Sequence, residues 1–247
     1  MANFWGIVNK VITDADLLLL VLDSRLIDET RNAELETKIR RAEKPLIYVM
    51  TKCDLAEKDS LDKMKTILKP SVFISAKDHL GLTKLRERIL IEAKRIGVKE
   101  RVTVGVLGYP NVGKSSLINA MRGQKSAPSG LLSGVTRGVQ KIKAGNRILF
   151  LDTPGVIPYQ EKDYLKHALT GTIDFTHAKE PDLVVFELMQ RYPGRIEAFY
   201  KVSVYDDKEE GLEAIALVRK ILIKGGEPDI MRMARVILKD WQKGVIP

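Results

Sequence analysis

Short apolar runs recur along the first part of the chain and alternate with stretches in which apolar residues have helical spacing. Four runs are typical of strands buried on both faces: Leu17–Leu22, Pro45–Met50, Val72–Ser75 and Val102–Leu107. The remaining stretches predict helices at Arg31–Ala42, Asp59–Leu68, Leu82–Ile96 and Lys114–Arg122. Strands that alternate with helices indicate an α/β fold with a mostly parallel, doubly wound sheet.

The pattern changes in the second half of the chain. Val139–Ala144 and Arg147–Leu151 flank Gly145-Asn146, a turn signal that predicts a hairpin. From Thr172 onward the pattern is helical, with candidate helices at Asp182–Gln190, Arg195–Val202, Glu209–Ile223 and Glu227–Lys243. The sequence therefore predicts an α/β domain over residues 1–171 and a small all-helical domain over residues 172–247.

The segment Gly108–Ser115 has the form Gly-x4-Gly-Lys-Ser and lies between a predicted strand and a predicted helix, which is typical of a P-loop NTPase domain. Its glycines let backbone N–H groups surround phosphate, and the helix that follows adds its positive end. Lys114 is expected to reach the β- and γ-phosphates, and the Ser115 hydroxyl to coordinate Mg²⁺. The predicted phosphate-binding residues are Gly108, Tyr109, Pro110, Asn111, Val112, Gly113, Lys114, Ser115 and Ser116.

Asp152-Thr153-Pro154-Gly155 follows an apolar strand downstream of this loop. The Asp152 carboxylate is expected to hold Mg²⁺ through water, and the Gly155 N–H to contact the γ-phosphate. Thr136 is the candidate switch threonine that completes the Mg²⁺ shell. The predicted metal site is therefore Ser115, Thr136 and Asp152.

Two further motifs predict recognition of a guanine base. In Thr51-Lys52-Cys53-Asp54, the Asp54 carboxylate can accept from both guanine donors, and the Lys52 stem can cover the base. Thr51 replaces the commoner asparagine of this motif. The second motif is Ser75-Ala76-Lys77, in which the Ala76 N–H can donate to the guanine carbonyl oxygen. A P-loop ATPase or kinase is the alternative, and Asp54 argues against it because adenine lacks the two donors.

The order of the motifs is unusual, because both base motifs precede the phosphate loop. An ordinary GTPase carries the phosphate loop first, so this order implies a circular permutation. In this order the motifs resemble circularly permuted GTPases of the YlqF/RbgA type. Further similarities are Ala168-Leu169-Thr170-Gly171, the segment Lys224–Asp229 and the segment Asp240–Gly244.

The resemblance implies a GTP-binding and GTP-hydrolysing protein that takes GTP or GDP with Mg²⁺ and acts in ribosome assembly. Two features depart from the family pattern. Asp23-Ser24-Arg25-Leu26 only approximates the family's D-A-R-x-P motif. The N-terminal histidine segment of the bacterial members is also missing, so no catalytic role transfers from it.

Hydrolysis is expected to be slow. Val156 stands where Ras-type enzymes have the glutamine that orients water, and a valine cannot do this. Lys114, Thr136 and Gly155 are the remaining candidates for stabilising the transition state, together with Asn111, at which similar GTPases bind K⁺. A GTP-dependent binding module without physiological hydrolysis is the alternative.

The charge of the chain suggests an anionic partner. The net charge is +9, and eight basic residues but no acidic one lie between Arg101 and Leu151. This excess fits ribosomal RNA or a ribosomal subunit precursor, and a solubilising surface is the alternative. On the final predicted helix, Arg232, Arg235, Lys239 and Lys243 fall on one face. A single cysteine and no apparent signal or membrane-spanning segment lead us to expect a cytoplasmic protein, and we expect a monomer.

Overall fold

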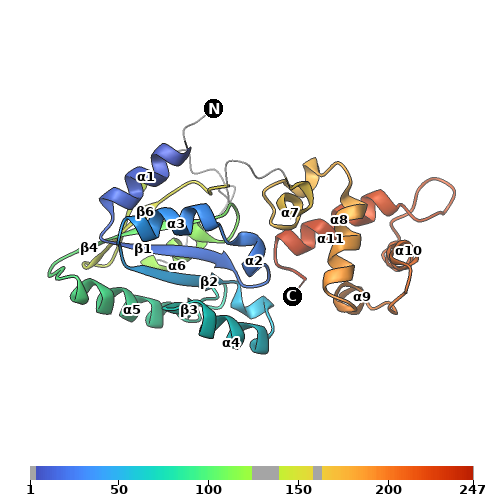
Figure 1. Ribbon diagram of the computed structural model, residues 1–247. Helices are drawn as coiled ribbons and strands as arrows, with labels where there is room; N and C mark the ends of the chain where they lie inside the picture. Colours follow the sequence, from blue (N-terminus) through green and yellow to red (C-terminus); the bar gives the residue numbers. More distant parts are fainter. Residues whose placement is uncertain (1–3, 124–138, 158–162, 247) are drawn as a thin grey trace. The chain divides into compact units, whose positions relative to one another are not determined.

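The computed structural model divides the chain into two compact units (Figure 1). It describes residues 4–123, 139–157 and 163–246. Unit 1 comprises residues 1–161 and unit 2 comprises residues 162–247. Because Thr136 lies outside the described residues, its expected role stays a prediction.

Unit 1 is an α/β domain with a six-stranded sheet of order β3-β2-β1-β4-β6-β5. All neighbouring strands pair in parallel except β5 and β6, which form the predicted antiparallel hairpin. The strands are β1 (Leu17–Asp23), β2 (Leu46–Thr51), β3 (Ser71–Phe73), β4 (Val102–Gly108), β5 (Gln140–Ala144) and β6 (Ile148–Asp152). The predicted fold class is therefore confirmed.

Helices cover both faces of this sheet, because its central strands are apolar on both sides. Along β1 the side chains of Leu17, Leu19 and Val21 enter one hydrophobic core, and those of Leu18, Leu20 and Leu22 enter the other. The helices of unit 1 are α1 (Phe4–Asp14), α2 (Ile27–Thr30), α3 (Ala33–Arg41), the 3₁₀ turn η1 (Cys53–Leu55), α4 (Lys58–Ile67), α5 (Leu82–Arg95) and α6 (Lys114–Arg122).

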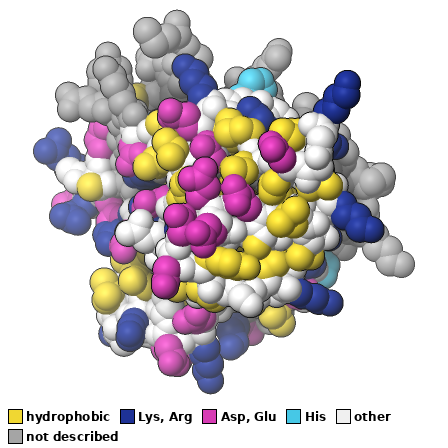
Figure 2. All heavy atoms as spheres, turned by 90° about the vertical axis from the view of Figure 1, so that its right-hand side faces the viewer, with side chains coloured by type: hydrophobic (Ala, Val, Ile, Leu, Met, Phe, Trp, Pro, Cys, Tyr) yellow, Lys and Arg dark blue, Asp and Glu magenta, His cyan; other side chains and the backbone are white. Residues whose placement is uncertain are grey.

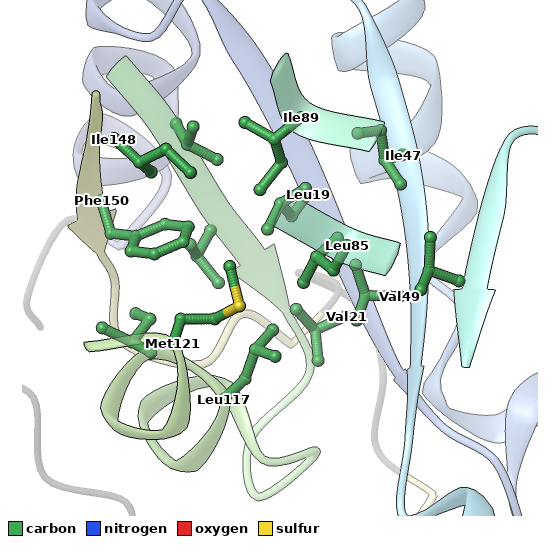
Figure 3. Close-up of a cluster of buried hydrophobic side chains, with 14 of the residues drawn as sticks. Leu19, Val21, Ile47, Val49, Leu85, Ile89, Leu117, Met121, Ile148 and Phe150 are labelled. Carbon is green, nitrogen blue, oxygen red and sulfur yellow. The ribbon is translucent and has the colours of Figure 1, made fainter. Parts of the chain in front are cut away.

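The first core lies between the sheet and helices α5 and α6. Leu85 and Ile89 of α5 pack with Leu117 and Met121 of α6 over residues of all six strands, among them Phe150 of β6 (Figure 3). This packing holds α6, and therefore the phosphate loop before it, against β4.

The second core includes α1, which the sequence analysis did not identify. Its residues Val8, Val11 and Ile12 are buried and have helical spacing. They pack with Leu35 and Ile39 of α3. The periodic signal was therefore present in the sequence, before the first strand.

Unit 2 consists of helices. They are α7 (Tyr164–Leu169), the 3₁₀ turn η2 (Phe175–His177), α8 (Pro181–Arg191), α9 (Arg195–Tyr200), α10 (Lys208–Val218) and α11 (Ile230–Gln242). Trp241 of α11 is fully buried, and its Nε1 donates to Leu169 O at 3.1 Å. The Gln242 side chain donates to Ala168 O at 2.8 Å and to Ile173 O at 3.0 Å. These bonds fasten α7 to the last helix.

Some element boundaries differ from the sequence prediction. The predicted domain boundary follows residue 171, whereas packing divides the chain after residue 161, because α7 is bonded to α11. Helix α10 ends at Val218, since Lys220 adopts a left-handed conformation (φ 53°) and a predicted helix to Ile223 cannot continue through it. Helix α11 begins only at Ile230, where the Asp229 side chain accepts from Arg232 N.

Candidate nucleotide-binding site

The predicted motifs gather at one edge of the unit 1 sheet. The strands β1, β2, β3, β4 and β6 are parallel, so their carboxyl ends share this edge. Thr51 ends β2, Gly108 ends β4 and Asp152 ends β6, and Ser75 follows β3 by two residues. The carboxyl edge of an open α/β sheet is the usual place for a ligand.

The phosphate loop has the backbone conformations that its glycines suggest. Gly108 and Gly113 have φ angles of 152° and 96°, and Asn111 is left-handed at 58°. A Cβ at Gly108 would lie 2.4 Å from Val21 O, so a larger residue would not fit there. Tyr109 and Val112 are buried in the first core. These two predicted binding residues can therefore offer a ligand their backbone rather than their side chains.

Lys114 is folded back onto the loop. Its Nζ donates to Gly108 O at 3.1 Å and to Tyr109 O at 2.7 Å, and the residue is 7% exposed. Burial lowers the pKa of Lys114 to about 8, and the nearby Asp152 opposes this only in part. Because burial disfavours the charged form of Lys114, an anionic ligand that pairs with its ammonium would stabilise that form.

Ser115 and Asp152 meet as predicted. The Ser115 hydroxyl donates to Asp152 Oδ2 at 3.0 Å. Burial raises the pKa of Asp152, which that hydrogen bond opposes, and its Oδ1 is buried without a hydrogen-bond partner among the described residues.

This donor set fits Mg²⁺, which prefers hard oxygen ligands and keeps several water or phosphate oxygens in its shell. The described residues contain no cluster of three or more His, Cys, Asp or Glu that could bind a metal by itself. An ion here would therefore depend on the phosphates of a bound nucleotide.

The segment after Asp152 rests on the phosphate loop. The Val156 N–H donates to Gly108 O at 3.1 Å, and the Val156 side chain is buried. A Cβ on Gly155 would lie 2.5 Å from Pro110 Cα, so only glycine fits this contact. The two motifs that are expected to surround the γ-phosphate are thus in direct contact.

The first base motif is tied to the same loop. The Thr51 hydroxyl donates to Leu22 O at 3.0 Å and also to Val112 O. Lys52 is left-handed (φ 55°), and its Nζ donates to Asn111 O at 3.2 Å. Thr51 therefore still bonds to the loop, although it is not the commoner asparagine.

The two base motifs lie side by side. The Cys53 N–H donates to Ile74 O at 3.2 Å, which joins the loop after β2 to the loop after β3. Asp54 is exposed, as its role in binding a base requires, whereas Ser75 is buried and its hydroxyl donates to Asp78 Oδ2 at 3.0 Å. The other predicted residues of this edge range from half-buried to exposed: Ala76, Lys77 and Ser116.

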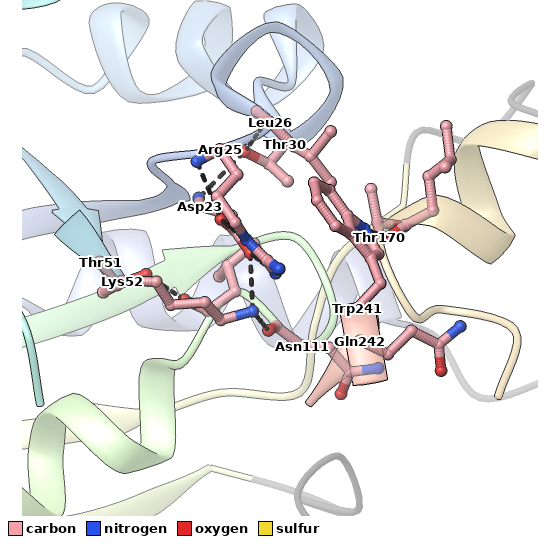
Figure 4. A network of polar contacts seen from close by, with 12 residues as sticks. Asp23, Arg25, Leu26, Thr30, Thr51, Lys52, Asn111, Thr170, Trp241 and Gln242 are labelled. Carbon is pink, nitrogen blue, oxygen red and sulfur yellow. Dashed lines mark hydrogen bonds and ion pairs between the residues drawn. The ribbon is translucent and has the colours of Figure 1, made fainter. Parts of the chain in front are cut away.

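Sequence reasoning did not assign a role to Asp23, which lies at the centre of the polar network of Figure 4. Its carboxylate bonds to Arg25 and to Lys52 Nζ, the latter at 2.6 Å. An acidic residue at the end of an otherwise apolar strand was the available signal.

The family model described as 50S ribosome-binding GTPase matches residues 103–219, which include the phosphate loop but not the base motifs. An uncharacterized GTP-binding protein of Methanocaldococcus jannaschii is 41% identical over 243 residues, which cover 96% of this chain and 64% of that protein. Nucleolar GTP-binding protein 2 of Yarrowia lipolytica is 32% identical over 258 residues, which cover 99% of this chain and 50% of that protein. The chain thus spans less than two thirds of the length of either relative.

Among solved structures, GNP-bound YlqF from T. maritima matches with a TM-score of 0.64 at 20% identity, covering 96% of this chain and 92% of that chain. The GDP-bound YlqF structure matches with a TM-score of 0.63 at 19% identity, covering 96% and 94%. These matches confirm the fold predicted from the motif order. No helix in the described residues is long and apolar enough to cross a membrane.

Proposed function

We propose that this chain, which has the motif order and the fold of circularly permuted YlqF-type GTPases, binds GTP and GDP, hydrolyses GTP slowly and couples its nucleotide state to a precursor of the large ribosomal subunit. One observation carries the proposal. Two base motifs and two phosphate motifs, in circularly permuted order along the chain, meet at one sheet edge, where hydrogen bonds join the first base motif to the phosphate loop and that loop to Asp152.

Each part of the edge has a separate task in this proposal. Asp54, Lys52 and the Ala76 N–H recognise guanine, and the loop N–H groups with Lys114 bind the phosphates. Ser115 and Asp152, together with Thr136, would hold Mg²⁺, which would supply positive charge against the phosphates. The Gly155 N–H responds to the γ-phosphate.

Hydrolysis depends on electrostatic stabilisation in this proposal. Val156 is buried and bonded through its backbone to Gly108, so it does not orient water. K⁺ at Asn111 would add the positive charge that an arginine supplies in other GTPases. We therefore expect faster turnover in K⁺ than in Na⁺ and loss of this difference in Asn111→Ala. Equal wild-type rates in the two salts would count against K⁺.

The connection to unit 2 supports coupling. The chain passes from Gly155 in unit 1 to α7, which begins at Tyr164 in unit 2. Since Trp241 and Gln242 hold α7 to α11, we expect a displacement that is passed along the chain to α7 to move the last helix with it. Release of the γ-phosphate is the event proposed to cause this displacement.

The exposed charged side chains of α10 and α11 differ in sign. On α11, Met233, Ala234, Ile237, Leu238 and Trp241 are buried, and Arg232, Lys239 and Lys243 are exposed. On α10, Glu209 and Glu210 are exposed in the first turn, and Leu217 and Val218 are exposed at the end of the helix. Acidic and apolar side chains gather on the face shown in Figure 2. RNA is therefore assigned to the basic face of α11 rather than to α10.

Salt dependence tests this assignment. Affinity for ribosomal RNA falls as salt rises, and the steepness of this fall on a log–log plot measures the number of phosphate contacts. Replacing Arg232, Arg235, Lys239 and Lys243 with Gln should reduce the magnitude of that slope by roughly 3 if all four contact phosphates. The control replaces four exposed lysines elsewhere: Lys58, Lys63, Lys65 and Lys69. Equal slopes in both variants would show that the basic residues of α11 do not contact RNA phosphates.

Co-sedimentation with ribosomal subunits tests the function as a whole. Binding to a large-subunit precursor should differ among the GTP-analogue, GDP and nucleotide-free states. Multiple-turnover assays with and without subunits distinguish a GTPase from the alternative, a GTP-dependent binding module without hydrolysis. GTP-dependent binding with no turnover under any condition would favour that module.

A further inference from the structure

The carboxylate of Asp23 is buried and all of its acceptor positions are used. The residue is 3% exposed. Its Oδ1 accepts from Arg25 N at 3.0 Å and from Arg25 Nε at 3.2 Å, and its Oδ2 accepts from Arg25 Nη2 at 3.0 Å and from Lys52 Nζ at 2.6 Å. A carboxylate held by four donors has a fixed orientation.

Lys52 connects this carboxylate to the phosphate loop. Its Nζ donates to both Asp23 Oδ2 and Asn111 O, while its backbone belongs to the base motif (Figure 4). The ammonium therefore joins the end of β1, the loop after β2 and the loop after β4. Since the Lys52 stem is the part expected to cover the guanine base, the position of Nζ sets the position of the stem.

The charges of the network depend on one another. Burial acts against ionisation of Asp23, but Arg25 and Lys52 outweigh it and hold the Asp23 pKa well below its usual range. Burial lowers the pKa of Lys52, and Asp23 is the group that counteracts this most strongly. The Lys52 side chain is partly buried (24% exposed), and a cation in such a place is destabilised when it loses its anion, so Lys52 would not keep this position without Asp23.

The backbone around Asp23 is also fixed. The Asp23 N–H donates to Thr30 Oγ1 at 3.1 Å, and the Ser24 N–H donates to Thr51 O at 2.9 Å. In contrast, Ser24 Oγ is buried without a hydrogen-bond partner among the described residues. The Ser24 hydroxyl therefore makes no bond that the alanine of the D-A-R-x-P motif would lack, whereas the aspartate and the arginine have defined partners.

We propose that Asp23, paired with Arg25, is a positioning residue for guanine recognition: it places Lys52 against the phosphate loop so that the lysine stem covers the base. This inference rests on the proposed function, because it assigns a role within the same site. It gives the Asp-x-Arg motif after β1 a task in base binding.

A double-mutant cycle tests the inference on the full chain. GDP affinity is measured for the wild type, Asp23→Asn, Lys52→Met and the double variant, with thermal unfolding of each. Asp23→Asn should lower GDP affinity about tenfold or more, since it disrupts a charge-assisted hydrogen bond. The double variant should bind GDP no more weakly than Lys52→Met alone, because Asp23 acts through Lys52.

A kinetic measurement separates positioning from general damage. In Asp23→Asn, KM for GTP should rise while kcat at saturating GTP stays within about twofold, because binding energy alone is lost. Asp16→Asn is the matched control: Asp16 precedes the same strand at its opposite end, where its carboxylate accepts from Thr103 N at 2.7 Å. This control should keep the wild-type GDP affinity.

The outcomes separate this inference from the proposed function. Should Asp23→Asn fail to fold, Asp23→Glu keeps the charge but shifts the carboxylate by one methylene, and it should lower GDP affinity severalfold. Wild-type affinity in the folded variants, or fully additive losses in the double variant, would overturn the inference alone. A wild-type protein that binds no guanine nucleotide would overturn the proposed function as well.

Discussion

The two halves of the nucleotide edge are built differently. In the base half, at the ends of β1, β2 and β3, side chains bond to neighbouring strands and loops, as in the bonds of Thr51 to Leu22 O and of Lys52 to Asp23. In the phosphate half, at the ends of β4 and β6, the groups that a nucleotide would use bond to one another. Lys114 donates to Gly108 O, and Ser115 donates to Asp152.

This difference indicates two sources of affinity. The base half is pre-organised, so a base that binds there orders few side chains. The phosphate half has to exchange internal hydrogen bonds for bonds to phosphate and Mg²⁺. It therefore gains from a ligand mainly through charge, and its contribution should depend on pH and on the number of phosphates.

Removing the phosphate-binding lysine should have the largest effect. Lys114→Met should lower GTP and GDP affinity by about 100-fold or more, because charge-assisted bonds to phosphate are lost. It should not lower the stability of the nucleotide-free protein, since burial makes the ammonium unfavourable there. Titration with GDP and urea unfolding measure the two quantities. Lys84→Met, on an exposed lysine of α5, serves as the control. A loss of stability without a loss of affinity would contradict the exchange model of the phosphate half.

The base half should show a change of specificity. Asp54→Asn should lower GTP affinity about 10- to 100-fold and favour xanthosine triphosphate, because an amide offers a donor where xanthine has a carbonyl. Competition between the two nucleotides measures the change, with Asp59→Asn on exposed α4 as the control. Wild-type GTP affinity without any gain for xanthosine triphosphate would show that Thr51–Asp54 does not bind the base.

The pH dependence should reside in the phosphate half. The pKa of Lys114 in the nucleotide-free protein is about 8, below its ordinary value of 10.5, so the unfolded chain binds more protons between these values and stability rises with pH in that window. Phosphate favours the charged lysine. GDP affinity should therefore fall about tenfold between pH 7 and pH 9, relative to Lys114→Met. If GDP affinity changed with pH in the same way in the wild type and in Lys114→Met, a group other than Lys114 would be responsible for the pH dependence.

The smallest effects compare two hydroxyls of the base half. Thr51→Val should cost about 1–2 kcal/mol of unfolding free energy, because Leu22 O and Val112 O lose their donor. Ser24→Ala should change it by less than about 1 kcal/mol, with a gain in stability as the expected sign, because Ser24 Oγ has no partner in the described residues. Urea unfolding measures both. Equal losses would mean that the bonds of Thr51 do not contribute to the rigidity of this half.

Features that depend on local spacing could be predicted from the sequence. The strands, the phosphate loop and the ends at which Thr51, Gly108 and Asp152 lie follow from short patterns. The role of Asp23 could not be predicted, because it requires the approach of Lys52 and of Asn111, which lie far along the chain. The left-handed turn at Lys220 that ends α10 was missed for another reason, since a lysine gives no signal for that conformation.

The order of the strands also bears on how unit 1 folds. Residues before β4 form the row β3-β2-β1, and residues from β4 onward form the row β4-β6-β5. Within the described sheet, the β1–β4 pairing alone, from Leu17 opposite Val104 to Val21 opposite Gly108, joins the two rows. Each row is built from strands close in sequence, whereas this junction closes a long loop and should form late. Asp23 and the phosphate loop lie at the carboxyl end of the β1–β4 pairing. A guanine nucleotide bound across them would therefore stabilise the strand pairing that should form last in this domain.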